Sequence, residues 1–204
     1  MRYFFLACLT SCVLQYGTPI KPISLQSAAE STFRVDIVGF DGQSLGSGTA
    51  WIVEYTNNTT YLITAGHVCA GDDKSYFKLF SKNSKSIPVD VVRFKTEPDL
   101  CLLSYKGWIN YPIPLASKDP NYGAETIYVG APGGIYGYDM APFFKGNYVG
   151  WHYVNNPASP GVSGSAVWTS EGVFGTLVAV NTNFHHLSFF VSRQDLVNFL
   201  NEKR

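Results

Sequence analysis

At residues 62–68 the chain reads LITAGHV, an apolar strand pattern that ends at His67. Two further motifs follow: PDLCLL, which places Asp99 just before an apolar segment, and SPGVSGSAV, which places Ser163 between glycines. A serine hydroxyl attacks a carbonyl carbon when a base removes its proton, and an imidazole can do this near neutral pH. A carboxylate on the other imidazole nitrogen fixes the tautomer and stabilises the imidazolium. The three motifs therefore predict nucleophilic catalysis by Ser163, with His67 as the base and Asp99 as its partner.

Short apolar segments lie on both sides of these motifs, with turn residues between them. Asp41-Gly42 and Asn57-Asn58 are typical of hairpin turns. The NNTT sequence at 57–60 also holds two overlapping glycosylation sequons, although we favour the polar turn. Many short strands at this spacing predict an all-β chain folded as barrels or a sandwich. The expected strands are 33–37, 49–55, 60–64, 76–81, 86–94, 100–105, 124–129, 141–151, 164–168, 173–181 and 188–191.

The C-terminal segment, residues 192–204, has a helical pattern instead. Ser192 and Asp195 form a capping box, and four apolar residues follow on one helical stripe. We expect a single α-helix over roughly residues 193–202, with its apolar face against the strands that precede it.

The composition excludes several classes of protein. The 204 residues carry 15 Lys and Arg against 15 Asp and Glu, so the chain lacks the basic footprint of a nucleic-acid-binding protein. Hydrophobic residues make up 46% and charged residues 15%, which excludes a disordered chain. His152, His185 and His186 have no carboxylate-rich or cysteine-rich neighbourhood, so we expect no metal site. The GAPGG sequence at 130–134 does not match a nucleotide-binding loop, and we expect no cofactor.

The N-terminal residues 1–17 are typical of an export signal, with Arg2 ahead of an apolar run that is too short to cross a bilayer. Two interpretations stay open. In one, LTSC is a lipobox in which Cys12 is lipidated, which would be the only route to membrane anchoring. In the other, an ordinary signal peptide is cut nearer Ala28 or Ala29. Both predict an exported protein, periplasmic or extracellular, in which residues 18–32 are a linker.

The order of the His, Asp and Ser motifs resembles the trypsin-like serine proteases, which carry TAxH, DLxLL and GxSG in that order. The GSGTA sequence at 46–50 resembles the turn ahead of their His strand. The YVGAPGG sequence at 128–134 is similar to Deg-type bacterial members, and SGS at 163–165 to glutamyl endopeptidases. The resemblance covers nearly all of residues 33–200.

This resemblance implies two six-stranded antiparallel β-barrels, at 33–106 and 118–191, joined by a crossing segment at 107–117. It implies a serine endopeptidase that hydrolyses a polypeptide substrate through an acyl-enzyme intermediate. The backbone N–H groups of Gly161 and Ser163 would then form the oxyanion hole.

The sequence also departs from the family. Val162 occupies the position of the Asp that pairs with a newly released N-terminus, so zymogen activation of that kind is not expected. Pro157 occupies the position where Arg- and Lys-specific members carry a carboxylate. An apolar substrate pocket is the remaining interpretation, and its candidate residues are Pro157, Val178, Ala179, Val180, His186 and Phe190.

Cys69 and Cys101 each follow a residue of the predicted triad by two positions. Because His67 and Asp99 must touch, the two cysteines are expected to be neighbours. A disulfide and a pair of buried free thiols both remain open.

Two rival functions remain beside the endopeptidase. One is a catalytically silent protease fold that binds peptides or a partner. The other is a viral or phage processing protease that cuts at one specific site. The sequence does not indicate an oligomeric state.

Overall fold

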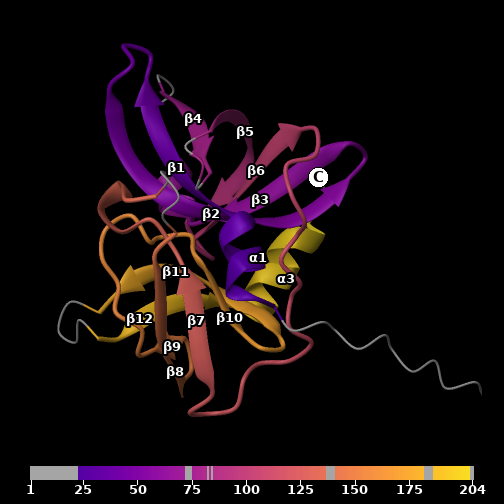
Figure 1. Cartoon of the computed structure of the whole chain (residues 1–204), viewed down its shortest axis with the longest axis vertical. Helices are drawn as coiled ribbons and strands as arrows, with labels where there is room; N and C mark the ends of the chain where they lie inside the picture. The colour runs from indigo at the N-terminus through magenta and orange to yellow at the C-terminus, as the bar shows by residue number, and fades with distance from the viewer. Residues whose placement is uncertain are drawn as a thin grey trace, which may run out of the picture.

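The computed structural model describes residues 23–71, 75–81, 83, 85–136, 141–181 and 186–202. Its strands form two closed antiparallel barrels of six strands each, one above the other in Figure 1. The predicted double barrel is therefore confirmed. The predicted signal segment and Cys12 lie outside the described residues. Among the residues that are described, no helix has the length and apolar character needed to span a bilayer.

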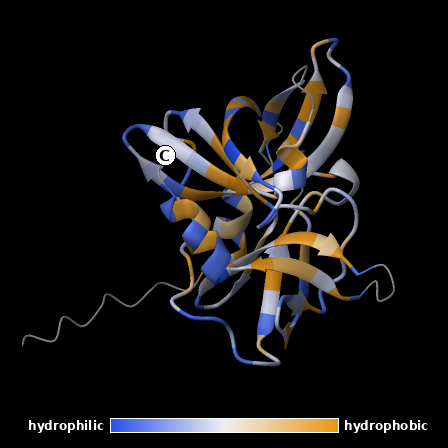
Figure 2. Ribbon diagram, turned by 180° about the vertical axis from the view of Figure 1, so that it is seen from behind, coloured by the Kyte–Doolittle hydropathy of each residue, from blue (hydrophilic) through white to orange (hydrophobic). Residues whose placement is uncertain are grey.

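The first barrel closes in the strand order β1-β2-β3-β6-β5-β4. Hydrophobic and hydrophilic residues alternate along its strands (Figure 2), which directs one face of each strand inward. Large apolar side chains such as Trp51, Leu62 and Leu102 are fully buried inside. Asn57 and Asn58 both have positive φ in the β2–β3 hairpin, as expected of the predicted turn. The strands are β1 (Thr32–Gly39), β2 (Ser44–Thr56), β3 (Thr59–Thr64), β4 (Ser75–Phe80), β5 (Ser86–Lys95) and β6 (Leu100–Lys106).

The second barrel closes in the order β10-β11-β12-β9-β8-β7. Its core is aromatic, with Tyr128 stacked on Phe144 and Phe174 edge-on to Phe190. The two-residue strand β9 was not predicted, because two residues are too few to show an alternating pattern. The strands are β7 (Glu125–Val129), β8 (Phe143–Gly150), β9 (Tyr153–Val154), β10 (Ala166–Thr169), β11 (Gly172–Val180) and β12 (Ser188–Ser192).

The crossing segment between the barrels is hydrogen-bonded to both of them. Ile113 N–H donates to Ile52 of the first barrel. Ala116 N–H donates to Val173 of the second barrel, and Val173 N–H donates back to Pro114. These bonds fix the path of the chain from one barrel to the other.

The C-terminal helix α3 (Arg193–Asn201) begins with the predicted capping box: Ser192 Oγ accepts a hydrogen bond from Asp195 N–H. The helix contacts β11 and β12 of the second barrel. It also reaches the first barrel, where the Arg93 guanidinium lies over the Phe199 ring, 4.6 Å from its centroid. The helix therefore contacts both barrels.

Residues 25–30, which the sequence analysis assigned to a linker, form helix α1 (Leu25–Glu30). Ser24 caps the helix, and both Ala28 and Ala29 are buried in the core. Six residues are too few to show helical periodicity, so the sequence gives no signal for this helix. A signal-peptide cut at Ala28 or Ala29 would break a segment that belongs to the fold.

Tyr136 ties this N-terminal segment to the second half of the chain. Its hydroxyl lies 2.8 Å from the Ala29 carbonyl oxygen and 2.9 Å from that of Thr32. Burial raises the pKa of Tyr136 far above its ordinary value, so the phenol keeps its proton, and its single O–H is shared between these two oxygens.

We predict that Tyr136→Phe lowers the free energy of unfolding by about 1–2 kcal/mol, because it removes a buried donor from two backbone carbonyls. Urea denaturation followed by tryptophan fluorescence measures the change. Tyr122→Phe is the control, because Tyr122 is 79% exposed and its hydroxyl makes no comparable contact with a described residue. Equal stability of the two variants would contradict the prediction.

Candidate active site

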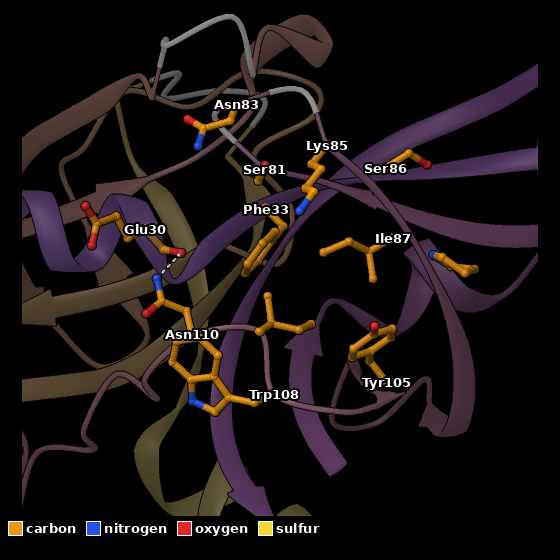
Figure 3. A pocket seen from close by; sticks show the side chains of 12 residues that line it. Glu30, Phe33, Ser81, Asn83, Lys85, Ser86, Ile87, Tyr105, Trp108 and Asn110 are labelled. Carbon is orange, nitrogen blue, oxygen red and sulfur yellow. Dashed lines mark hydrogen bonds between the residues drawn. The ribbon is translucent and has the colours of Figure 1, made fainter. Parts of the chain in front are cut away.

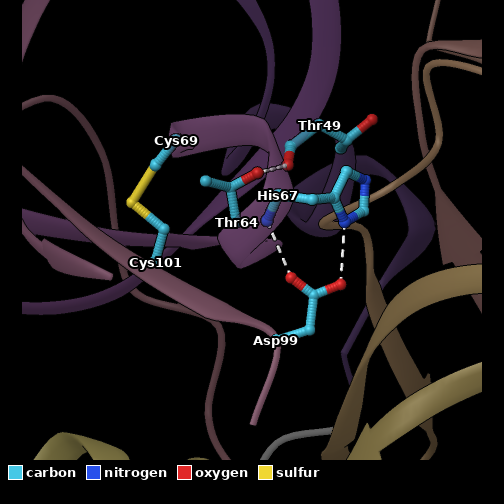
Figure 4. The surroundings of a disulfide bond; sticks show 6 residues. All are labelled: Thr49, Thr64, His67, Cys69, Asp99 and Cys101. Carbon is cyan, nitrogen blue, oxygen red and sulfur yellow. Dashed lines mark hydrogen bonds and ion pairs between the residues drawn. A yellow bond between two sulfur atoms is a disulfide. The ribbon is translucent and has the colours of Figure 1, made fainter. Parts of the chain in front are cut away.

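His67 and Asp99 meet at one edge of the first barrel. Strand β3 ends at Thr64, and the single-turn helix α2 (Gly66–Cys69) turns His67 toward the segment ahead of β6. Asp99 Oδ1 accepts a hydrogen bond from the His67 backbone N–H, and Asp99 Oδ2 lies 2.7 Å from His67 Nδ1 (Figure 4). The carboxylate therefore holds both the backbone and the ring of His67, and it leaves Nε2 free to act as a base.

The hydrogen bond and the negative charge of Asp99 raise the pKa of His67 above its ordinary 6.5, and partial burial opposes them. The His67 side chain is 50% exposed and that of Asp99 27% exposed. A cavity of about 300 Å³ borders Asp99, His152 and Phe189. The His67–Asp99 pair is therefore accessible to solvent.

A disulfide joins Cys69 to Cys101 beside this pair (Figure 4). It links α2, which carries His67, to β6, which follows Asp99. Of the two states that the sequence left open, the structure has the bridge. The disulfide holds helix α2 at Cys69, and the two hydrogen bonds to Asp99 hold it at His67.

Ser163 lies in a loop between the barrels whose conformation requires glycine on both sides. Gly161 and Gly164 have φ of 95° and 94°. A Cβ on Gly164 would also lie 2.0 Å from the Thr49 carbonyl oxygen and 2.3 Å from Thr64 Oγ1. The serine loop therefore packs against β2 at Thr49 and against β3 at Thr64, and Thr64 precedes His67 by three residues.

The Ser163 side chain is not hydrogen-bonded to the histidine in this structure. Among the described residues its hydroxyl has the Val178 carbonyl oxygen as hydrogen-bond partner, at 3.4 Å, and not the His67 ring. A bond of this length is weak. The structure thus brings His67 and Asp99 into contact, and it places the Ser163 loop against the same barrel edge with the hydroxyl turned toward β11.

The backbone N–H groups of Gly161 and Ser163 are directed by their neighbours. The Pro160 carbonyl accepts from Gly133 N–H at 2.7 Å, and the Val162 carbonyl accepts from Ser165 N–H and Oγ. In a trans peptide the N–H points opposite to the preceding carbonyl. Neither N–H donates to another residue in the described part of the chain, so both are available to an oxyanion.

The predicted specificity residues divide into two groups. Pro157, Ala179 and His186 are exposed and Val180 is half-buried, so a substrate can reach them. Val178 and Phe190 are buried. Phe190 packs on Tyr148 and Phe174 in the barrel core, and its neighbour Phe189 faces the cavity beside Asp99. The substrate-contacting role of these six residues stays a prediction.

A separate pocket of about 510 Å³ lies on the first barrel, and the exposed Trp108 and the buried Phe33 are among the side chains that line it (Figure 3). No residue of the three motifs lines it. Within the described ranges, no group of three or more His, Cys, Asp or Glu residues could hold a metal ion. His185 lies outside those ranges.

The fold has close counterparts among solved structures. No protein-family model matches the sequence, and comparison with curated proteins finds no match. The Rv3671c protease from M. tuberculosis, in its active form, matches with a TM-score of 0.73 and 15% identity over 89% of this chain and 87% of its own. The HtrA-type protease AlgW, determined with a tripeptide, matches with a TM-score of 0.70 and 18% identity over 86% of this chain and 60% of its own.

A serine endoprotease from Yersinia pestis matches with a TM-score of 0.73 and 16% identity over 89% of this chain and 66% of its own. The chain thus spans about two thirds or less of the length of two of these proteins. The likeness establishes the fold: this chain has the double β-barrel of the trypsin-like serine proteases.

Proposed function

We propose that the chain is a serine endopeptidase in which His67, Asp99 and Ser163 form the catalytic triad. The observation that carries the proposal is the pair of hydrogen bonds that the Asp99 carboxylate accepts from the backbone N–H and the ring of His67. A carboxylate that holds both the backbone and the ring of one histidine fixes its tautomer and leaves Nε2 as a base. The adjacent loop presents a serine and two backbone N–H groups with no acceptor among the described residues.

In the proposed reaction, Ser163 Oγ bonds to the carbonyl carbon of a peptide while its proton passes to His67 Nε2. The carbonyl oxygen becomes an oxyanion that accepts hydrogen bonds from Gly161 and Ser163 N–H. The imidazolium then donates its proton to the leaving amine as the C–N bond breaks. Water repeats the sequence on the acyl-enzyme and releases the acid.

The weak bond from Ser163 Oγ to the Val178 carbonyl supports a role for the substrate in setting up this reaction. Beyond Thr176 the pairing of β11 with β10 ends, and within the described ranges Ala179 and Val180 pair with β12 and with no other strand. An extended peptide that adds to the open edge can donate an N–H to the Val178 carbonyl. The Ser163 hydroxyl then loses its partner and turns toward His67.

The surroundings support a substrate side chain that is small or apolar rather than Arg or Lys. Pro157, Ala179 and Val180 carry no charge, and no carboxylate occurs in residues 155–160 or 178–181. Val162 is buried in the second barrel core, where it cannot act as the ionic partner of a new N-terminus. We therefore propose an enzyme that forms its active loop without zymogen cleavage.

The Cys69–Cys101 disulfide supports an exported protein, because such bonds persist in oxidising compartments. The silent binding module remains the second candidate, favoured by the Ser163 hydroxyl facing Val178 rather than His67. The two candidates differ in whether Ser163 is activated.

We predict that a fluorophosphonate probe labels the wild-type protein, since the probe reacts with activated serines. Ser163→Ala is expected to abolish labelling, and His67→Ala to reduce it at least about 10³-fold. Intact mass spectrometry and in-gel fluorescence measure the adduct. Well-folded wild-type protein that takes no label would overturn the endopeptidase and favour the binding module.

We predict that kcat/KM on a peptide substrate rises with pH through an apparent pKa above 6.5. The base must be neutral, and Asp99 favours the protonated imidazole. Asp99→Asn removes this effect, so the apparent pKa falls toward or below 6.5, and kcat falls by about 10⁴-fold. A pH–rate profile of both proteins measures the shift. An unchanged apparent pKa in the Asn variant would contradict the assigned pair.

A further inference from the structure

Thr49 lies in β2 of the first barrel, fully buried, at the point where the serine loop of the second barrel meets it. We propose that the Thr49 hydroxyl is the positioning group for the oxyanion hole. This inference rests on the proposed endopeptidase function, and it assigns part of that function to a residue outside the three motifs.

The backbone of Thr49 connects the histidine motif to the serine loop. Its N–H donates to the Ser163 carbonyl at 2.8 Å, and its carbonyl accepts from Thr64 Oγ1 at 2.7 Å (Figure 4). Any residue in this strand could make the first bond. The backbone therefore fixes where the loop lies, and the side chain must account for the choice of threonine.

The hydroxyl of Thr49 uses both its donor and an acceptor position. Oγ1 donates to the Gly161 carbonyl at 2.8 Å, and it accepts from Ala131 N–H at 3.0 Å. Both partners are buried backbone groups of the second barrel. A hydroxyl can satisfy the two at once, and a methyl group of the same size can satisfy neither.

These two bonds hold the peptide units on either side of Gly161. The bond to the Gly161 carbonyl fixes the unit that follows it. The bond from Ala131 anchors the 3₁₀ turn η1 (Pro132–Gly134), whose Gly133 N–H holds the Pro160 carbonyl of the preceding unit. Glycine has no Cβ to restrict its backbone, and Gly161 has a φ of 95°. The direction of its N–H is therefore set by these contacts.

The first barrel supports the same turn at a second point. Arg34 Nη1 donates to the Gly134 carbonyl at 2.9 Å, and Asp36 pairs with Arg34 at 2.7 Å. Arg34 is the direct cross-strand partner of Thr49. Thr49 and Arg34, neighbouring side chains of the first barrel, thus both hold the second-barrel backbone that orients the Gly161 N–H.

The test measures kcat and KM for wild type, Thr49→Val and Thr49→Ser on one peptide substrate. Complete loss of an oxyanion donor lowers kcat by about 10²–10³-fold. Misdirection of the Gly161 N–H in Thr49→Val is expected to lower kcat about 10–100-fold, with KM changed less than about threefold, because the donor acts on the transition state. Thr49→Ser keeps the hydroxyl and is expected to stay within about threefold of wild type.

Thr64→Val is the matched control for stability. It also removes a buried hydroxyl from this cluster, but one that is bonded to the Thr49 carbonyl rather than to Gly161. Urea denaturation is expected to show a loss of stability in both valine variants, larger in Thr49→Val because it leaves two buried backbone groups unpaired instead of one, with the larger loss of kcat confined to Thr49→Val. Where Thr49→Val does not fold, Thr49→Ala removes the same hydroxyl with less bulk and gives the same comparison.

Each outcome is decisive. A wild-type enzyme that turns over while Thr49→Val matches its kcat overturns the positioning role alone. A loss of kcat in Thr49→Ser equal to that in Thr49→Val also overturns it, because the hydroxyl would then not be the cause. A folded wild type with no turnover and no fluorophosphonate labelling overturns the proposed function, and the role of Thr49 with it.

Discussion

The hydrogen bond from Thr49 N–H to the Ser163 carbonyl joins the two barrels at the point where the candidate site is built. Each barrel closes on itself, so the covalent chain alone does not fix how one sits against the other. His67 and Asp99 belong to the first barrel, and Ser163 belongs to the second. Close packing around this bond, where Gly164 has no room for a Cβ, sets their relative position.

The two halves of the site differ in how firmly they are held. The His67 half is held by the Asp99 carboxylate and by the Cys69–Cys101 disulfide. On the serine half the backbone is fixed, but the hydroxyl has only a weak bond at 3.4 Å to Val178. The Ser163 hydroxyl is therefore the part of the candidate site that is held least firmly.

Much of the architecture could be predicted from the sequence, because strand alternation, turn residues and a capping box are local signals. These signals predict helix α3 and an all-β chain folded as barrels or a sandwich, and the resemblance to the trypsin-like serine proteases implies the two six-stranded barrels. Helix α1 and strand β9 were missed, since six and two residues are too short to show a period.

The triad candidates and the two loop glycines were identified from the sequence because catalysis and positive φ restrict the residue type at those positions. Thr49 was not identified, because a threonine in a strand has no distinguishing signal. Its contacts with Gly161 and Ala131 join residues about 80 or more positions apart. Only the closure of one barrel against the other brings such residues together.

The most direct test of this account is a crystal structure of the wild-type protein after reaction with a peptidyl phosphonate. The account predicts phosphorus bonded to Ser163 Oγ, which has moved away from the Val178 carbonyl. One phosphonyl oxygen should lie about 2.7–3.1 Å from the backbone nitrogens of both Gly161 and Ser163. An adduct on another residue, or a phosphonyl oxygen that contacts neither nitrogen, would contradict the account.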